Sequence, residues 1–232
     1  MELLSIIVLS TGNKEQFECT LDSLSKLSYP SFEIIVMEKM GEQSTVQMLT
    51  LDEKLKGKLR CLALPQEMKP GAALNAASRL AKGTFITFLG EGAVLSPMGS
   101  SIAIDSLSRI SGAGWCYSAA QIRGAGELLP PVNWPDYKKE GNLFSDLMAE
   151  RSVSFSSVVM TREQVSELRG FDEDLPALVE EEFLLRLSKA YPALYLRMKT
   201  LDIAKKECGE EEKENEVIAR CYMISEFLTD LN

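Results

Sequence analysis

Five short stretches of this 232-residue chain carry side chains suited to chemistry. Four of them follow apolar runs, and the fifth is a group of glutamates late in the chain. The candidate residues are Ser10, Thr11, Asn13, Glu38, Lys39, Gly71, Asn75, Gly90, Glu91, Gly92, Glu180 and Glu182. Carboxylates in this set can hold a divalent cation or take a proton from a hydroxyl group, and hydroxyls and amides can bind a polar ligand.

The composition restricts this chemistry. The chain has no histidine, the side chain that most often serves as a general base. Acid-base chemistry therefore falls mainly to Asp, Glu, Lys, Tyr or Cys. The formal net charge of -9 argues against nucleic acid as a partner, because that binding needs Lys and Arg to displace counterions.

The cysteines and the first ten residues indicate the cellular compartment in which the protein is expected. The five cysteines are scattered and form no CxxC pair, which favours free buried thiols in a reducing compartment. Residues 1–10 lack the positive start of a signal peptide, and no run approaches the ~18 apolar residues of a membrane span. We therefore expect a cytoplasmic protein without a membrane span.

The apolar runs predict the strands that position the candidate residues. Strands are expected at residues 3–9, 32–37, 59–64 and 84–89, and the first has the apolar sequence of a strand that is buried on both faces. Helices are expected between them, at residues 17–27, 43–55 and 70–82. This alternation predicts an α/β fold with a doubly wound, mostly parallel sheet and helices on both faces. Ligands bind such sheets beyond the carboxyl ends of the strands, where four of the five stretches lie.

The second half of the chain is less regular. Strands are expected at residues 114–122, 152–160 and 194–201, helices at 96–110, 143–151 and around 183–187, and a loop at 128–137. Thr161 with Gln164 predicts a capping box. An acidic run, residues 209–216, leads into a terminal helix with an expected apolar face of Val217, Cys221, Ile224 and Leu228. We expect this helix to pack on the domain, the alternative being a partner chain or a further domain.

Five segments, in this order, resemble glycosyltransferase family 2, whose members have the A-type nucleotide-sugar transferase fold. Residues 5–37 resemble its opening strand, helix and second strand, including the Tyr-Pro pair. Residues 69–89 (KPGAALNAASRLAKGTFITFL) resemble its segment of Gly, Asn and a final Lys-Gly before strand four. Residues 90–97 stand where the family has its acidic metal motif, 156–175 end in Gly-Phe-Asp-Glu, and 179–187 resemble the helix with the catalytic carboxylate.

The resemblance implies transfer of a sugar from a nucleoside-diphosphate sugar to a glycan, lipid-linked or protein acceptor, with inversion. It implies a divalent cation, Mn or Mg, that bridges the two phosphates, and a carboxylate that takes the acceptor proton. We expect residues 1–205 to form the transferase-like domain, with 1–97 as the nucleotide-binding half and 98–205 as the acceptor half. Residues 206–232 would add the acidic segment and the helix.

The implied roles divide the candidate residues into three groups. Glu180 and Glu182 are the catalytic candidates, and Glu91 is the metal candidate. The nucleotide-sugar candidates are Ser10, Thr11, Asn13, Glu38, Lys39, Gly71, Asn75, Gly90, Glu91 and Gly92.

The chain departs from the family pattern at its metal motif and at two other places. The family's Asp-x-Asp aligns with residues 90–92, where only Glu91 has a side-chain oxygen. The acidic residue after strand two aligns with Lys39, which cannot accept a hydrogen bond. The family's Glu-Asp pair aligns with Val179 and Glu180, and Glu182 is a second carboxylate two residues on.

Each candidate also has a simpler interpretation. Glu91 is either a weak metal ligand or a polar loop residue, and Lys39 either balances phosphate charge or is solvated. The glutamates at 180–182 either include the general base or form an acidic helix start. Gly71 and Asn75 either shape the donor pocket or build the turn into a helix. Two hypotheses follow: a transferase with weak or no metal dependence, and a catalytically degenerate domain kept for binding or assembly.

Overall fold

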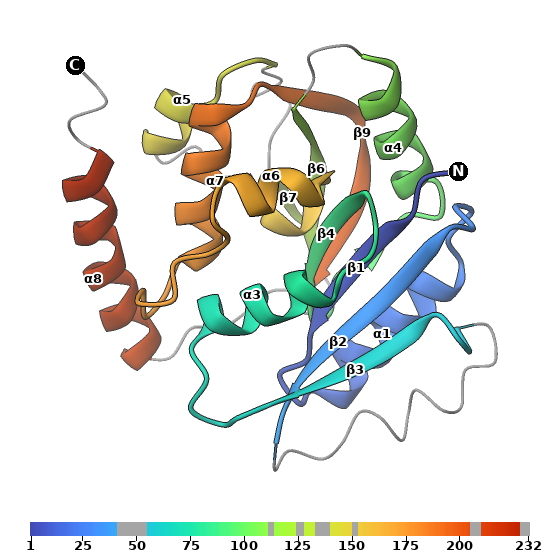
Figure 1. Cartoon of the computed structure of the whole chain (residues 1–232), viewed down its shortest axis with the longest axis horizontal. Coiled ribbons are helices and arrows are strands. Elements are labelled where there is room, and N and C mark those ends of the chain that lie inside the picture. The colour runs from blue at the N-terminus through green and yellow to red at the C-terminus, as the bar shows by residue number, and fades with distance from the viewer. Residues whose placement is uncertain are drawn as a thin grey trace.

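The computed structural model describes residues 1–40, 55–110, 114–123, 128–132, 140–149, 153–204 and 210–227 (Figure 1). Nearly all of the helix expected at 43–55 and the last part of the loop expected at 128–137 lie outside these residues. Among the described helices, none is long and apolar enough to cross a membrane.

A five-stranded sheet forms the first half of the molecule. Its parallel strands are β1 (Leu4–Leu9), β2 (Phe32–Lys39), β3 (Leu59–Leu64) and β4 (Phe85–Gly90), in the order β3-β2-β1-β4. The short antiparallel β8 (Met160–Thr161) pairs with the outer edge of β4. The predicted doubly wound, mostly parallel sheet is confirmed. Strands β1, β2 and β4 are mostly apolar because both of their faces are covered, whereas edge strand β3 is partly exposed at Cys61 and Ala63.

A second, four-stranded sheet has the order β5-β9-β6-β7. It consists of β5 (Val94–Leu95), β6 (Trp115–Arg123), β7 (Leu128–Val132) and β9 (Ala193–Ala204). Strands β6 and β9 run parallel, and the two outer pairs are antiparallel. A bridge between Cys116 and Val159 connects β6 to the residue before β8, so the chain around β8 joins the two sheets.

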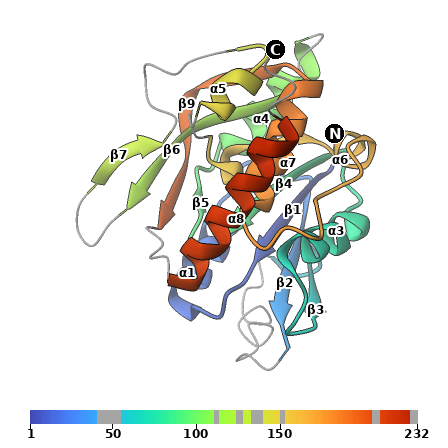
Figure 2. The same cartoon turned by 90° about the vertical axis from the view of Figure 1, so that its left-hand side faces the viewer.

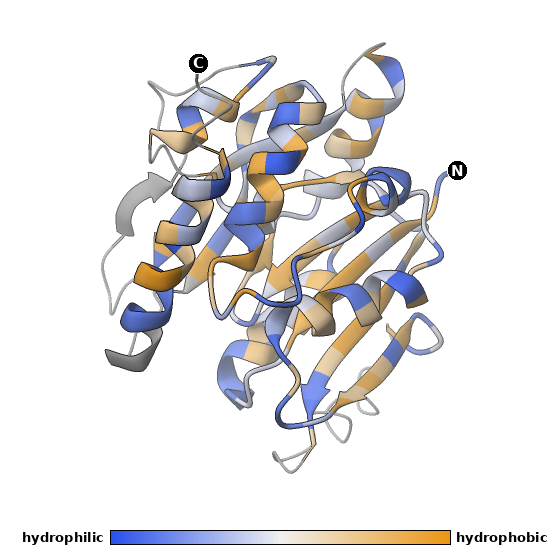
Figure 3. Ribbon diagram, turned by 60° about the vertical axis from the view of Figure 1, so that its left-hand side comes forward, coloured by the Kyte–Doolittle hydropathy of each residue, from blue (hydrophilic) through white to orange (hydrophobic). Residues whose placement is uncertain are grey.

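Helices cover both faces of the sheets. Helices α1 (Lys14–Ser25) and α4 (Gly99–Arg109) pack on one face. Helices α3 (Pro70–Leu80), α6 (Arg162–Glu167) and α7 (Val179–Ala190) pack on the other. The central strands are largely apolar between these layers (Figure 3). The predicted capping box is confirmed, because the side chains of Thr161 and Gln164 bond each other's backbone N–H.

Two predicted segments differ in the structure. Residues 128–132 form edge strand β7 instead of a loop, and an edge tolerates Pro130 and Pro131, which have no N–H to donate. Residues 152–160 do not form one long strand, because the 3-10 turn η1 (Phe155–Ser157) interrupts them. The Ser157 hydroxyl donates to Ser154 O at 2.7 Å, a local bond that competes with strand pairing.

The terminal helix α8 (Glu210–Phe227) lies beside α7, as both views show (Figures 1 and 2). The predicted apolar face is wrong where it is described, since Val217 and Cys221 are exposed. The buried side chains of α8 are Ala219, Met223 and Phe227, and the last two pack with Phe144 and Leu185. Phe144 belongs to α5 (Phe144–Met148), so α8 packs on α5 and α7. The face is set by these long-range contacts, which helical periodicity alone does not reveal.

The cysteines are only partly as expected. The four in the described residues are free thiols, as predicted, but Cys116 alone of these is buried.

The Glu33 carboxylate joins four segments at the amino end of the parallel strands. It accepts hydrogen bonds from Ser5 Oγ of β1, from the Lys82 N–H after α3 and from Arg60 Nη2 of β3, each at 2.6 Å. Burial by itself would raise the pKa of Glu33, but these donors and the Arg60 charge hold that pKa below its ordinary value. The charged form therefore stabilises the fold.

Glu33→Gln should lower the free energy of unfolding by about 1–2 kcal/mol near neutral pH, because charge-assisted bonds are lost. A lowered folded-state pKa gives stability that is present above the unfolded pKa and is lost as pH falls through the folded pKa. In urea titrations, the gap between wild type and variant should narrow as pH falls below about 5. A gap that stays constant under acid conditions would contradict this account.

Candidate active site

The carboxyl ends of β1, β2 and β4 bring three of the candidate stretches together. Leu9 is paired in register with Met37 on one side and Gly90 on the other. The Ser10 N–H donates to Met37 O at 2.9 Å, which continues this pairing past the end of β1. The three candidate stretches therefore begin side by side at the carboxyl edge of the sheet, as the parallel-sheet prediction requires.

Glu91 ties the loop after β4 to the turn between β1 and α1. Its Oε2 accepts hydrogen bonds from the Thr11 N–H at 2.9 Å, the Asn13 N–H at 3.2 Å and the Thr11 hydroxyl. Its Oε1 accepts from Ser10 Oγ at 3.2 Å. Asn13 also caps α1, with Oδ1 accepting from the Gln16 N–H at 3.1 Å. Four sequence-predicted residues thus form one hydrogen-bonded cluster.

The glycines beside Glu91 anchor the same loop. The Gly90 N–H donates to Ser156 Oγ of η1 at 3.2 Å, and the Gly92 N–H donates to Thr20 Oγ1 of α1 at 3.0 Å. Gly92 has a φ of +83°, which favours glycine. A Cβ placed on Gly90 would meet no heavy atom within 4 Å. The loop is therefore held from both sides and leaves open space at Gly90.

Glu38 and Lys39 are the last two residues of β2, so the predicted end of this strand at residue 37 is two residues short. Because side chains alternate along a strand, these two point to opposite faces. Glu38 is buried, and its carboxylate adds to the effect of burial in raising the pKa of the Cys61 thiol to about 11. Lys39 is half-buried and continues the face of Met37, which α3 and α7 cover.

Asn75 clamps α3 to the segment that precedes α7. Its Nδ2 donates to Phe171 O at 2.9 Å and to Glu173 Oε1 at 2.8 Å. Its Oδ1 accepts from the Phe171 N–H at 2.8 Å. A Cβ on Gly71 would lie 2.0 Å from Asp172 O, so glycine is required for this close approach. In the structure, Gly71 and Asn75 hold the Gly-Phe-Asp-Glu segment against α3.

The two catalytic candidates have different surroundings in α7. Glu182 is buried and forms a bidentate ion pair with Arg186, with Nε–Oε1 at 2.6 Å and Nη2–Oε2 at 2.7 Å. Arg186 also donates to Leu168 O at 2.6 Å and to Gly170 O at 2.9 Å, so this pair holds the turn before the Gly-Phe-Asp-Glu segment. Glu180 lies half-buried in the first turn of α7.

A cluster of four buried phenylalanines, Phe88, Phe155, Phe171 and Phe183, connects the end of β4 to α7. The ring centroids of Phe88 lie 5.4 Å from Phe155 and 5.1 Å from Phe171. Those of Phe171 and Phe183 are 4.5 Å apart. Offset and edge contacts of this kind add to the stabilisation from burial. The cluster fixes the carboxylate helix relative to the loop that carries Glu91.

Sequence reasoning missed two residues around this site. Arg186 stands four residues after Glu182, and this helical spacing could have identified the ion pair. Tyr222 of α8 forms a side-chain hydrogen bond with Asp172, and its pKa is raised by burial and by nearby carboxylates. No local pattern could have identified this contact, because α8 is remote in sequence from Asp172.

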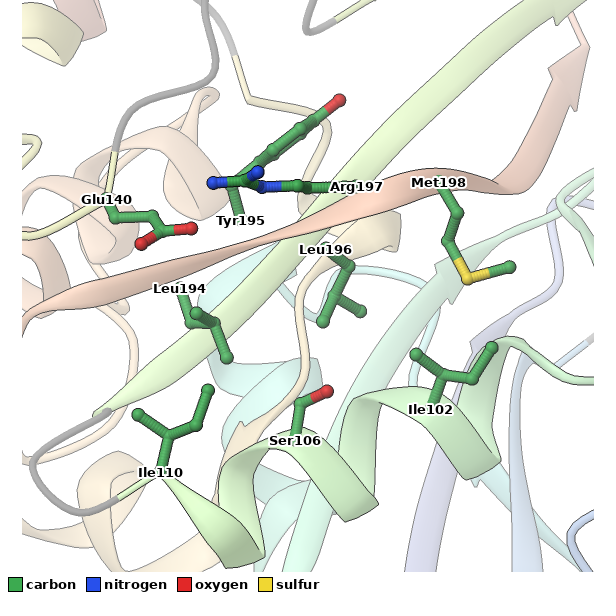
Figure 4. Close-up of a pocket in the computed structure, with 9 residues that line it drawn as sticks. All are labelled: Ile102, Ser106, Ile110, Glu140, Leu194, Tyr195, Leu196, Arg197 and Met198. Atoms are coloured by element: carbon green, nitrogen blue, oxygen red, sulfur yellow. The ribbon is translucent and has the colours of Figure 1, made fainter.

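A separate groove of about 380 Å³ lies between α4 and β9 (Figure 4). Leu194, Leu196 and Met198 face Ile102 and Ile110 across it. Its charged lining residues are Glu140 and Arg197, and it includes none of the candidate residues. This groove is apolar and lies away from the strand ends where Glu91 is found.

The comparisons with known proteins bear on this arrangement. The model of Glycosyl transferase family 2 matches residues 5–143. The chain belongs to this family. An uncharacterized glycosyltransferase of Haemophilus influenzae is 22% identical over 187 residues, which cover 80% of this chain and 62% of that relative. The chain thus spans less than two thirds of the length of this curated relative.

Solved structures of other proteins share the fold. S. aureus TarS, residues 1–349, matches with a TM-score of 0.71 at 17% identity, over 98% of this chain and 66% of TarS. A second TarS structure is in complex with UDP-GlcNAc. It matches at the same TM-score and identity, over 98% of this chain and 72% of the TarS chain. The mannosyltransferase PcManGT from Pyrobaculum calidifontis, in complex with GDP-Man and Mn²⁺, has a TM-score of 0.69 at 13% identity, over 97% of this chain and 64% of PcManGT. At these identities the likeness establishes the A-type transferase fold.

The fold suggests a divalent cation, but the described residues after β4 do not fit one. Two of the three positions in the metal motif are glycine, and the Glu91 oxygens accept four hydrogen bonds. In the described part of the chain, no group of three Cys, Asp or Glu side chains could hold a metal ion.

Asn75→Ala should lower the free energy of unfolding by about 2–3 kcal/mol, because it leaves the buried Phe171 N–H and C=O without partners. It should also increase hydrogen exchange in residues 168–173. Ser78→Ala, on the same helix, removes only a local bond to Leu74 O and is the matched control. Urea unfolding and amide exchange test this pair, and equal stability of the two variants would refute the proposed clamp.

Proposed function

We propose that this chain binds a nucleoside-diphosphate sugar at the carboxyl ends of β1, β2 and β4 and transfers its sugar to a hydroxyl acceptor. The observation that carries the proposal is the convergence of the β1–α1 turn, the end of β2 and the loop after β4, tied together by Glu91. Family membership supports the sugar-transfer role. The acceptor would be a glycan, a lipid-linked molecule or a protein.

Each part of the edge has a role in this proposal. The turn of Ser10, Thr11 and Asn13 surrounds the nucleoside, and the Lys39 charge balances phosphate. The open space beside Gly90 receives the diphosphate and the sugar, since a Cβ added to this glycine would have no heavy atom within 4 Å. Complexes of similar folds with UDP-GlcNAc and GDP-Man support this class of donor.

Glu180 is the proposed general base. Glu182 is committed to Arg186, and Glu180 lies half-buried in the first turn of the same helix, at the position that aligns with the family's Glu-Asp pair. In the transfer step, the acceptor hydroxyl gives its proton to the Glu180 carboxylate. The oxygen then forms a bond to the anomeric carbon as the bond from that carbon to the phosphate oxygen breaks. The nucleoside diphosphate leaves, and the anomeric configuration inverts.

Calorimetric titration with UDP, GDP and dTDP, with and without manganese, tests nucleotide binding. We expect at least one of these nucleotides to bind, because the cluster around Glu91 presents a formed turn. Absence of binding by all three nucleotides and their common sugar conjugates, under both conditions, would contradict the proposed function.

Glu180→Gln should reduce the rate of sugar transfer or donor hydrolysis by about 100-fold or more, the usual contribution of a general base. Nucleotide affinity should stay unchanged, because Glu180 contacts the acceptor. Glu163→Gln is the matched control, since Glu163 is an exposed glutamate in the first turn of α6. Measured initial rates that are equal in wild type and Glu180→Gln would exclude this role.

A second candidate function is a catalytically degenerate transferase domain that serves in binding or assembly. The glycines at both outer positions of the metal motif and the commitment of Glu91 and Glu182 to structural bonds favour it. This function predicts nucleotide binding without turnover. Sugar transfer that is abolished by Glu180→Gln would refute it.

A further inference from the structure

Glu91 is the one residue of the metal motif that could offer a cation its side chain, and its carboxylate is already in use. Both oxygens accept hydrogen bonds, three on Oε2 and one on Oε1. Moving this carboxylate to a cation would break its bonds to the Thr11 and Asn13 N–H groups. These bonds to a charged carboxylate are charge-assisted, and their loss opposes the movement.

Hydrogen bonds to three different elements hold the loop around Glu91 in position. Gly90 is bonded to η1, Glu91 to the β1–α1 turn, and Gly92 to α1. Each of the three motif residues therefore contacts a different element of the protein. In a metal-dependent site, the ion and its carboxylates would share this task of shaping the edge.

Lys39, the last residue of β2, has the positive charge that would balance a diphosphate. Lys39 continues the face of Ile35 and Met37, and position 90 continues the face of Ile86 and Phe88. These four apolar residues belong to one core cluster, so Lys39 and the open space at Gly90 lie on the same side of the sheet. Gly90 is in register with Met37 across β1, so Lys39 lies two residues further along and about 12 Å from Gly90, a gap that a lysine stem and a diphosphate together can span.

We propose that nucleotide binding by this chain is independent of divalent cations, and that Glu91 is a positioning residue that shapes the β1–α1 turn by accepting its hydrogen bonds. This inference rests on the proposed function, because it concerns the same nucleotide site. Glu91 acts on the nucleotide indirectly, by holding Ser10, Thr11 and Asn13 in position. Lys39 supplies the positive charge that balances the diphosphate.

Two substitutions of Glu91 separate a positioning role from metal ligation. In Glu91→Gln, an amide oxygen in the place of Oε2 can still accept from the Thr11 and Asn13 N–H groups and the Thr11 hydroxyl, and the amide nitrogen in the place of Oε1 can donate to the Ser10 hydroxyl. Glu91→Ala removes all of these bonds. A positioning residue should therefore be rescued by glutamine, whereas a metal ligand should not, because a neutral amide replaces the carboxylate that a divalent cation prefers.

The experiment titrates wild type, Glu91→Gln, Glu91→Ala and the control Glu163→Ala with UDP, GDP and dTDP, in EDTA and in excess manganese. We expect wild-type affinity to agree between the two buffers within about twofold, a difference well under 1 kcal/mol. Glu91→Gln should stay within about threefold of wild type, and Glu91→Ala should bind about tenfold or more weakly in both buffers. Glu163→Ala should bind as wild type does.

Other outcomes overturn the inference in distinguishable ways. Wild-type binding that requires manganese overturns cation independence but leaves the proposed function standing. Binding that is as weak in Glu91→Gln as in Glu91→Ala, or unchanged in Glu91→Ala, overturns the positioning role. Absence of binding by wild type in both buffers overturns the proposed function itself. Thermal unfolding tests whether each variant is folded. If Glu91→Ala is not folded, the affinities of wild type and Glu91→Gln in the two buffers still test cation independence and the positioning role.

Discussion

The packing of four phenylalanines against one another is the constraint on which the candidate site depends. They come from β4, η1, the Gly-Phe-Asp-Glu segment and α7, and their rings meet at centroid distances from 4.5 to 6.1 Å. Asn75 adds three hydrogen bonds that hold the same segment to α3. Together they hold the carboxyl edge of the parallel strands and the helix of Glu180 in a fixed relative position, which the proposed transfer between two bound substrates requires.

Above this core, hydrogen bonds within the chain perform a task that the family usually shares with an ion. The Glu91 carboxylate accepts hydrogen bonds from the β1–α1 turn, and the Glu182 carboxylate forms an ion pair with Arg186. Both carboxylates connect segments that are distant in sequence or position, so both are structural members of the site. We therefore assign the direct role toward the donor to Lys39 and the direct role toward the acceptor to Glu180.

Much of the fold could be predicted from the sequence, because the inner parallel strands β1, β2 and β4 are buried on both faces and are therefore mostly apolar. The capping box at Thr161 and the convergence of loops at the strand ends follow from equally local patterns. Edge strand β7, turn η1 and the buried face of α8 could not be predicted, since pairing and packing partners decide them. The same holds in the site, where the bonds of Asn75 to Phe171 and of Glu91 to Thr11 cross about 100 and 80 residues of chain.

The most direct test of this account is the initial rate of sugar transfer or donor hydrolysis by the wild-type chain, measured across a panel of nucleoside-diphosphate sugars in chelator and in manganese. The account predicts turnover of at least one donor, at the same rate in both conditions, because protein hydrogen bonds and a lysine shape and neutralise the site. A rate that appears only with manganese and disappears in chelator would contradict it.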